Sequence, residues 1–338
     1  MRTIHLHIGS PKTGTTSIQN NFFVNKSKLR KQGFLYPGKT VDQQLIYFGG
    51  KPEKEFWPRK FKSINARQLD YSVRTFFQNF ETEINTDENT HLDVIASSEY
   101  LFEYKDGHVQ CLIKYLKRFF DEIKVYVFVR IPIHYYKSAE QQGIKHRSYI
   151  INPWCFKYPF RDAITRWSNH TNLRVLKYSP GLDSFDTLVE SLGLESSEFQ
   201  VYKKKLNPSM SIEQMLLLEK LQHHLYQNYE NRFKNHLSII SQINSSFSNK
   251  PQLQEWVSPV IYMRHKEDLF WLSQNHGIDF GSNFEDETKD IKRLLHTDKV
   301  TVRSVFKVDN EYGAEKYEAL ILDSLLKKIV KTSSVAVG

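Results

Sequence analysis

Residues 3 to 17 constrain the fold of this chain more than any other stretch, because they combine a short strand, a glycine-bearing turn and the start of a helix. The strand is predicted from three alternating apolar residues, Ile4, Leu6 and Ile8. Gly9 and Gly14 permit the tight backbone path of the turn. Since the first amide groups of a helix have no partners within the helix, this arrangement predicts a binding place for an anion.

The position of the lysine narrows the kind of anion. In a nucleotide-binding loop of the form G-x-x-x-x-G-K-[ST], the lysine directly follows the second glycine. Here Gly9 and Gly14 have that spacing, but Thr15 follows Gly14, and Lys12 lies inside the turn. The lysine register therefore argues against a nucleotide kinase, which remains the alternative class of enzyme.

The same loop resembles the P-K-[ST]-G-T-[TS] loop of sulfotransferases that use 3′-phosphoadenosine 5′-phosphosulfate (PAPS). The matching residues are Ser10, Pro11, Lys12, Thr13, Gly14, Thr15 and Thr16. The resemblance implies that the 5′-phosphosulfate is held by the loop backbone from Thr13 to Thr16 and by the hydroxyls of Thr15, Thr16 and Ser17. It also implies that Lys12 neutralises the charge that develops on the bridging oxygen. A chance match of two glycines is the alternative.

A second anion-binding element is indicated after the predicted strand at residues 123–129. Arg130 follows this strand, Pro132 suits the first turn of a helix, and Ser138 lies about two turns later. The element resembles R-[DN]-P-x(5)-S, with which sulfotransferases hold the 3′-phosphate of the nucleotide, although Ile131 stands where Asp or Asn is usual. The resemblance implies a charge-assisted contact from Arg130 and a hydroxyl donor from Ser138. The alternative is that Arg130 pairs with a carboxylate and Ser138 faces water.

Group transfer to a hydroxyl requires a base, because a hydroxyl is a poor nucleophile until its proton is removed. Glu99, just beyond the predicted strand at residues 92–97, is the preferred candidate. The Ser-Ser-Glu segment that ends at Glu99 is similar to the version found in bacterial members of the sulfotransferase family, whose base is a histidine or glutamate at this place. His7 is the second candidate, although a histidine in a central strand is typically packed and hydrogen-bonded. A surface or helix-capping role is the alternative for Glu99.

The alternation of strands and helices predicts the fold class. Strands are expected at residues 92–97, 123–129 and 173–178, and the second of these is almost continuously β-branched or aromatic. Such a strand is buried on both faces, as in a parallel sheet between helices. We therefore expect an α/β fold with a P-loop-type, doubly wound parallel sheet, functional groups at the carboxyl ends of its strands, and a mostly helical C-terminal half.

Hydrophobic periodicity places the helices and the domain limits. Helices are predicted at residues 15–32, 68–84, 108–120, 158–167, 185–192, 211–229, 256–274 and 314–331. Residues 38–65 are predicted to be an irregular insertion that either contacts the acceptor or merely connects surface elements. A single domain over residues 1–331 is expected, with a PAPS-binding core at about 1–180, a helical extension at about 181–331 and a tail at 332–338.

Composition limits the location and the partners. The hydrophobic content of 40% is sufficient for a core, and no run of about 18 apolar residues or signal-like N-terminus is present, which favours a cytoplasmic protein without a transmembrane segment. Cys111 and Cys155 lie among apolar residues without metal-ligand spacing, so we expect reduced core thiols and no metal. The net charge of +9 favours an anionic cofactor or substrate, and we expect no nucleic-acid partner.

These expectations combine into a cytoplasmic sulfotransferase that transfers the sulfuryl group of PAPS to a saccharide hydroxyl and releases 3′-phosphoadenosine 5′-phosphate (PAP). The saccharide would be a polysaccharide precursor, an oligosaccharide or a glycolipid. A catalytically silent glycan- or nucleic-acid-binding protein is the other alternative. Ser17 replaces the family's adenine-stacking tryptophan and a late Arg-Lys-Gly triplet is missing, so the adenine pocket is unassigned. Two basic runs, at 203–205 and 264–266, are each expected either to supply positive charge for the cofactor or an acidic acceptor, or to form a solvated turn.

Overall fold

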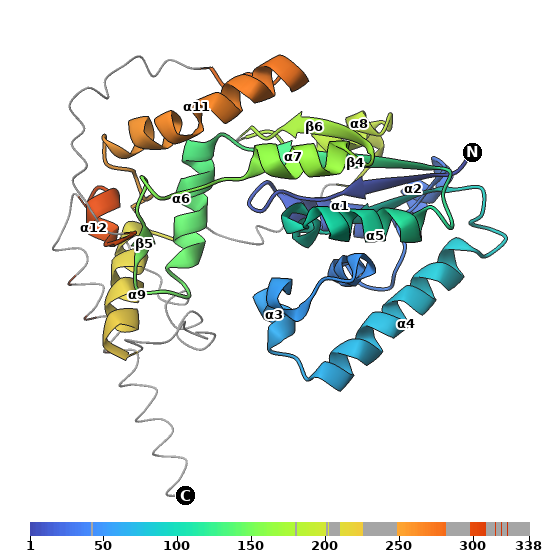
Figure 1. Ribbon diagram of the computed structural model, residues 1–338, viewed down its shortest axis with the longest axis horizontal. Coiled ribbons are helices and arrows are strands. Elements are labelled where there is room, and N and C mark those ends of the chain that lie inside the picture. Colours follow the sequence, from blue (N-terminus) through green and yellow to red (C-terminus); the bar gives the residue numbers. More distant parts are fainter. Residues whose placement is uncertain are drawn as a thin grey trace, which may run out of the picture. The chain divides into compact units, whose positions relative to one another are not determined.

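The computed structural model describes residues 1–41, 43–179, 181–200, 202, 210–225, 249–281 and 298–308, and the isolated residues 315, 319 and 323. The chain divides into two compact units. Figure 1 labels helices and strands of both. The first unit comprises Met1–Ile131, Pro159–Leu206 and Asp268–Phe280. The second comprises Pro132–Tyr158, Asn207–Glu267 and Gly281–Gly338. The predicted helix at 314–331 and the tail at 332–338 lie outside the described residues, except for three isolated helical positions.

The first unit is built on a parallel sheet of five strands in the order β2-β3-β1-β4-β6. The strands are β1 (Thr3–His7), β2 (Phe34–Leu35), β3 (Asp93–Ser97), β4 (Glu122–Val129) and β6 (Asn172–Lys177). β1 lies between β3 and β4, where His7 pairs with Ser97 on one side and with Tyr126 on the other. The predicted α/β class and parallel sheet are confirmed.

Helices flank this sheet. Those predicted at residues 68–84, 108–120, 158–167 and 185–192 are found to within a few residues, whereas a short helix at 59–62 falls in the insertion predicted to be irregular. The flanking helices are α1 (Thr15–Val24), α2 (Lys26–Lys31), α3 (Arg59–Lys62), α4 (Ala66–Ile84), α5 (Asp106–Leu116), α7 (Phe160–Ser168) and α8 (Ser184–Ser191). Short 3₁₀ helices are η1 (Gln44–Gly50), η2 (Lys54–Phe56), η3 (Glu99–Glu103) and η4 (Ser196–Glu198). Because parallel crossovers are right-handed, the connections leaving β1 and β3 in opposite directions place α1 and α5 on opposite faces of the sheet.

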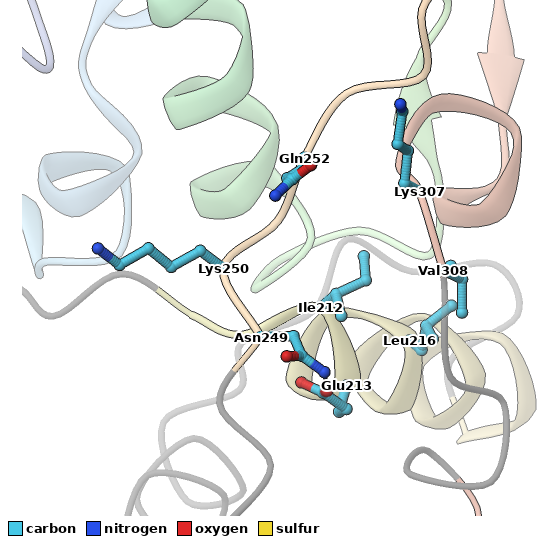
Figure 2. Close-up of a pocket in the computed structure, with 8 residues that line it drawn as sticks. All are labelled: Ile212, Glu213, Leu216, Asn249, Lys250, Gln252, Lys307 and Val308. Carbon is cyan, nitrogen blue, oxygen red and sulfur yellow. Dashed lines mark hydrogen bonds between the residues drawn. The ribbon is translucent and has the colours of Figure 1, made fainter.

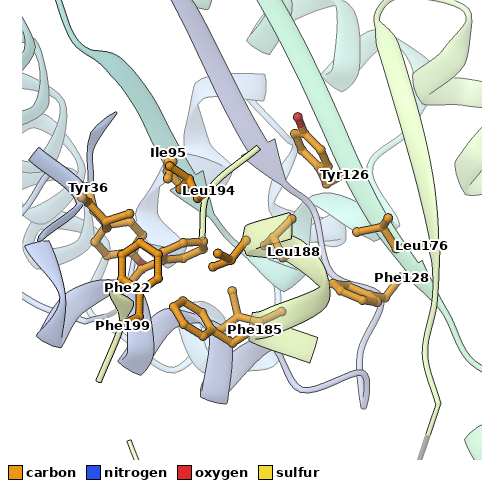
Figure 3. Packing of buried hydrophobic residues seen from close by; sticks show 13 residues of the cluster. Phe22, Tyr36, Ile95, Tyr126, Phe128, Leu176, Phe185, Leu188, Leu194 and Phe199 are labelled. Carbon is orange, nitrogen blue, oxygen red and sulfur yellow. The ribbon is translucent and has the colours of Figure 1, made fainter. Parts of the chain in front are cut away.

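A cluster of buried aromatic and aliphatic side chains joins α1 and α8 to one face of the sheet (Figure 3). Phe22 of α1 lies edge-on to Phe185 of α8, with ring centroids 5.2 Å apart. The strands contribute Ile95, Tyr126 and Phe128 from alternate positions, as expected for a pleated sheet. This packing fixes the start of α1 relative to the ends of the strands.

The second unit is described by itself. It contains α6 (Pro132–Gly143), β5 (Ile150–Ile151), α9 (Ile212–Leu225), β7 (Lys299–Val300), α12 (Val302–Val305) and α11 (Val257–His276) as far as Glu267. β5 and β7 form a short antiparallel pair. In this unit the buried carboxylate of Glu140 accepts hydrogen bonds from the Arg147 guanidinium and from the amide of Ile151. These bonds compensate for the free-energy cost of burying the carboxylate.

Two local predictions are wrong. The helix predicted at residues 15–32 is broken at Asn25, whose side-chain amide donates to the carbonyls of Asn21 and Gln200, each at 2.8 Å. Cys111 and Cys155 are exposed rather than in the core, although both are free thiols.

Within the described residues, the helices are too short or too polar to span a bilayer.

Candidate functional site

The carboxyl ends of the parallel strands meet at one edge of the sheet, and backbone hydrogen bonds continue beyond the strands there. The amide of Ser98 donates to the carbonyl of His7 at 3.0 Å, and the amide of Phe128 donates to the carbonyl of Gly9 at 3.0 Å. These bonds hold the segments after β1 and β3 against each other and against β4. Such an edge, next to the strand at which the connections change direction, is where α/β sheets bind ligands.

Arg130 reaches from the end of β4 to the loop after β1. Its Nη1 donates to the carbonyl oxygen of Lys12 at 3.0 Å, and its guanidinium lies 5.0 Å from the ring centroid of Tyr178. The structure therefore brings together the two cationic residues that the sequence predicted for the site, although they are 118 positions apart.

Glu99 lies against the same loop. A Cβ atom added to Gly9, whose φ is +90°, would stand 2.9 Å from Cα of Glu99, which is closer than real Cβ atoms approach. Gly9 is therefore required both for its backbone conformation and for this contact. Glu99 is the first residue of η3, directly beyond Ser98 and the end of β3.

The loop itself holds a strained residue at the position of the lysine. Lys12 has φ +66°, in the left-handed region that non-glycine residues avoid at a cost of about 1–2 kcal/mol. The hydroxyl of the buried Thr13 donates to the carbonyl of Ser10 at 2.6 Å and closes the turn. A strained backbone that neighbouring hydrogen bonds maintain is a frequent feature of ligand-binding loops.

The start of α1 is equipped to bind an anion. Gly14 precedes the helix without a capping side chain, and no acidic residue occupies the first turn of α1. Thr16 is exposed and Ser17 is half-buried. Thr15 is 4% exposed, and its hydroxyl has no hydrogen-bond partner among the described residues. Buried polar atoms without partners are uncommon and point to a missing ligand or water.

Sequence reasoning missed two residues at this edge. A Cβ atom at Gly14 would stand 2.7 Å from Oγ of Ser184, the first residue of α8, so this helix also begins beside the loop. Tyr178 directly follows β6, and its amide donates to the carbonyl of Val129 at 2.8 Å. Its position at the end of the strand predicted at 173–178 could have drawn attention to Tyr178, whereas the proximity of Ser184 depends on how α8 packs.

No model of a known protein family matches this chain, and no curated protein matches it.

The insertion at residues 38–65 contacts the segment that carries Glu99. The rings of Tyr47 and Phe61 meet the ring of Tyr100 edge-on, with centroids 6.1 Å and 5.6 Å away. Since Tyr47 and Phe61 are buried, the insertion is more than a surface connection.

The side chain of His7, the last residue of the central strand β1, is buried. It is 1% exposed, and its Nδ1 and the Ser97 hydroxyl are hydrogen-bonded at 2.9 Å. Burial lowers the pKa of His7 to about 3, so the imidazole is neutral near pH 7. A buried base with such a low pKa accepts a proton poorly, which favours Glu99 over His7 for proton removal.

The buried His7 is expected to make stability depend on pH. Between pH 6.5 and about 3, only the unfolded chain binds a proton at His7. The contribution of His7 to the free energy of unfolding is therefore fully present above pH 6.5 and is lost progressively as the pH is lowered. This contribution has a slope of up to about 1.4 kcal/mol per pH unit. His7→Asn should make the acid side of the profile shallower by up to this amount in urea unfolding at several pH values. The matched substitution of the exposed His91, His91→Asn, should leave the slope unchanged; an equal change in both variants would contradict the assignment.

The remaining predicted positions belong to the second unit or lie outside the described residues. Ser138 is half-buried in α6 of the second unit. The basic run at 264–266 lies within α11 and is not a turn. His265 of that run is buried, where its Nε2 accepts the amide of Tyr158 at 3.1 Å. Residues 203–205 lie outside the described residues.

A small cavity of about 130 Å³ lies in the second unit (Figure 2). In it Glu213 accepts a hydrogen bond from the side-chain amide of Asn249 at 2.8 Å. Across the described residues, we find no cluster of three or more histidine, cysteine, aspartate or glutamate side chains arranged to hold a metal ion.

Proposed function

We propose that this protein is a sulfotransferase that uses PAPS as donor and a saccharide hydroxyl as acceptor. The observation that carries the proposal is the hydrogen bond from Arg130 to the backbone of Lys12. It joins the two elements that resemble the 5′-phosphosulfate and 3′-phosphate sites of PAPS-dependent sulfotransferases. A nucleotide with anions at both ends requires two such elements at one edge of a sheet.

Other observations support an anionic donor here. The uncapped start of α1 offers amide groups and the positive end of the helix dipole. The hydroxyls of Thr15, in the first turn of α1, and of Ser98, directly after β3, are buried without partners in the described part of the chain. These groups suit the oxygens of a phosphate or sulfate.

PAPS would supply an activated sulfuryl group, whose bond to the bridging phosphate oxygen breaks during transfer. Lys12 and the amides from Thr13 to Thr16 would hold the charge that develops on that phosphate. Arg130, at the end of β4, would hold the 3′-phosphate through its guanidinium. Glu99 would orient the acceptor hydroxyl and take its proton as the oxygen bonds to sulfur.

The proposed function is tested by supplying PAPS with radiolabelled sulfate and a panel of acidic and neutral oligosaccharides and glycolipids. Label is expected in at least one saccharide, and PAP is expected as the second product. Stabilisation by ATP with magnesium but not by PAP would indicate a nucleotide kinase instead. Binding of saccharides without any transfer of label would indicate a silent binding protein.

Lys12→Gly separates the strain of the loop from the role of the lysine charge. Glycine relieves the left-handed strain but loses about 0.5–1 kcal/mol of chain entropy, so the free energy of unfolding should stay within about 1 kcal/mol of wild type. Sulfate transfer should fall at least about 100-fold, because a group that stabilises developing charge is lost. Urea unfolding and the label assay measure the two effects.

Lys51 provides the matched control for this variant, since its φ of +51° is also left-handed. Lys51→Gly should give a similar small change in stability and full transfer activity. Comparable activity in the two glycine variants would contradict a role for the Lys12 side chain.

A further inference from the structure

A second cavity lies in the first unit, at the edge of the sheet formed by β2. It has a volume of about 710 Å³, which is within the range of small-molecule sites. Its walls come from the end of α1, the start of α2, residues 37–40 with Gln43 from the following loop, and the second half of α4. None of the predicted site residues lines it.

One wall of the cavity is aromatic. Phe76 and Phe80 of α4 lie nearly parallel, at an interplanar angle of 20° with ring centroids 6.2 Å apart, and Phe23 of α1 also lines the cavity. Flat apolar groups pack well against aromatic rings of this kind.

A positively charged side chain, that of Lys26, also lines the cavity. The ammonium group of Lys26 lies 5.0 Å from the ring centroid of Phe23 and donates to the carbonyl of Gly38. Within the described part of the chain, it forms no ion pair with a carboxylate. Glu83, the acidic residue that lines the cavity, accepts the amide of Gly38 at 2.8 Å. The exposed Lys39 adds a second positive charge at the rim.

We propose that this cavity binds a small organic anion with a flat apolar body, whose charged group lies at Lys26 and whose body lies against Phe76 and Phe80. Burial lowers the pKa of the Lys26 ammonium group against the opposing effect of Glu83. An anion placed beside a partly desolvated ammonium group compensates for that burial. The proposal does not depend on the sulfotransferase function.

A bound ligand would also hold the loop that leads to the sheet. Gln43, which lines the cavity, donates to the carbonyl of Pro37 at 2.8 Å and accepts the amide of Ser97 at 2.8 Å. Ligand binding should therefore slow hydrogen exchange at the amides of Gly38 and Ser97.

The test uses naphthalene-2-carboxylate and its uncharged counterpart naphthalene-2-carboxamide, titrated into the full chain and followed by ligand-observed NMR. We expect the carboxylate to bind at least about tenfold more tightly, since a charge-assisted contact is lost in the amide. Lys26→Met should reduce carboxylate affinity to that of the carboxamide. Lys28→Met, on the same helix and outside the cavity lining, should leave both affinities unchanged.

Asn79→Trp gives an independent test at an exposed position of the cavity wall, where a larger side chain does not threaten folding. It should abolish binding of both compounds and the slower exchange at Gly38 and Ser97. Any of three results would overturn the proposal: equal affinities for the two compounds, an unchanged carboxylate affinity in Lys26→Met, or no binding at millimolar concentration. So would displacement of the carboxylate by PAP, because it would locate binding at the loop after β1.

Discussion

Replacing Arg130 with alanine is expected to weaken PAP binding by up to about 100-fold, since a charge-assisted hydrogen bond contributes about 1.5–3 kcal/mol. The guanidinium already lies at the loop after β1, where Nη1 donates to the carbonyl of Lys12 at 3.0 Å. At a PAP concentration of about 100 times the wild-type Kd, mass action stabilises the protein by about 2.7 kcal/mol. With 100-fold weaker binding, the stabilisation falls to about 0.4 kcal/mol. Thermal unfolding with and without PAP measures this loss.

Arg174→Ala is the matched control for Arg130→Ala. Arg174 also donates from a guanidinium nitrogen to a backbone carbonyl, that of Ser191 at 3.2 Å, but it is exposed and lies within β6 rather than beyond its carboxyl end. This variant should keep the full PAP-induced rise in melting temperature. The ligand-free melting temperatures of both variants report the loss of the structural hydrogen bond separately. An undiminished PAP effect in Arg130→Ala would remove the second anion site from the proposal.

The central strands could be predicted because their signal is local. β3 and β4 are runs of apolar and β-branched residues whose ends are marked by a change to polar residues, and the structure places them within one residue of the predicted limits. β3 and β4 each pair in parallel with β1, so the carboxyl ends of the three strands meet at one edge of the sheet. For this reason the proximity of Arg130, which follows β4, and Lys12, which follows β1, could be expected from the sequence.

Features that depend on distant contacts could not be predicted in the same way. Asn25 ends α1 partly because its side chain bonds Gln200, 175 positions away, and no local pattern reports that contact. The sequence neighbours of Cys111 are largely apolar, but the buried side of α5 is formed by Val109, Leu112 and Leu116. Sequence neighbours point in different directions on a helix, so the apolar company of Cys111 was a poor guide to its burial.

Replacing Glu99 with glutamine is expected to reduce sulfate transfer by about 100- to 10,000-fold, which is the usual contribution of a general base. Glutamine keeps the size of the side chain and removes only its ability to take a proton. The contact between Glu99 and Gly9 involves the backbone and Cβ of residue 99, so the substitution leaves the loop in place. PAP binding, followed by thermal unfolding, should therefore be unchanged while label transfer is lost.

Glu103→Gln is the matched control, because it makes the same change from carboxylate to amide at the last residue of the same 3₁₀ helix. If general electrostatics of η3 supported transfer, both variants would lose activity to a similar degree. If proton removal by residue 99 is the essential step, only Glu99→Gln becomes inactive. Full activity of Glu99→Gln would exclude Glu99 as the base, and His7, which burial holds neutral, would become the next residue to test.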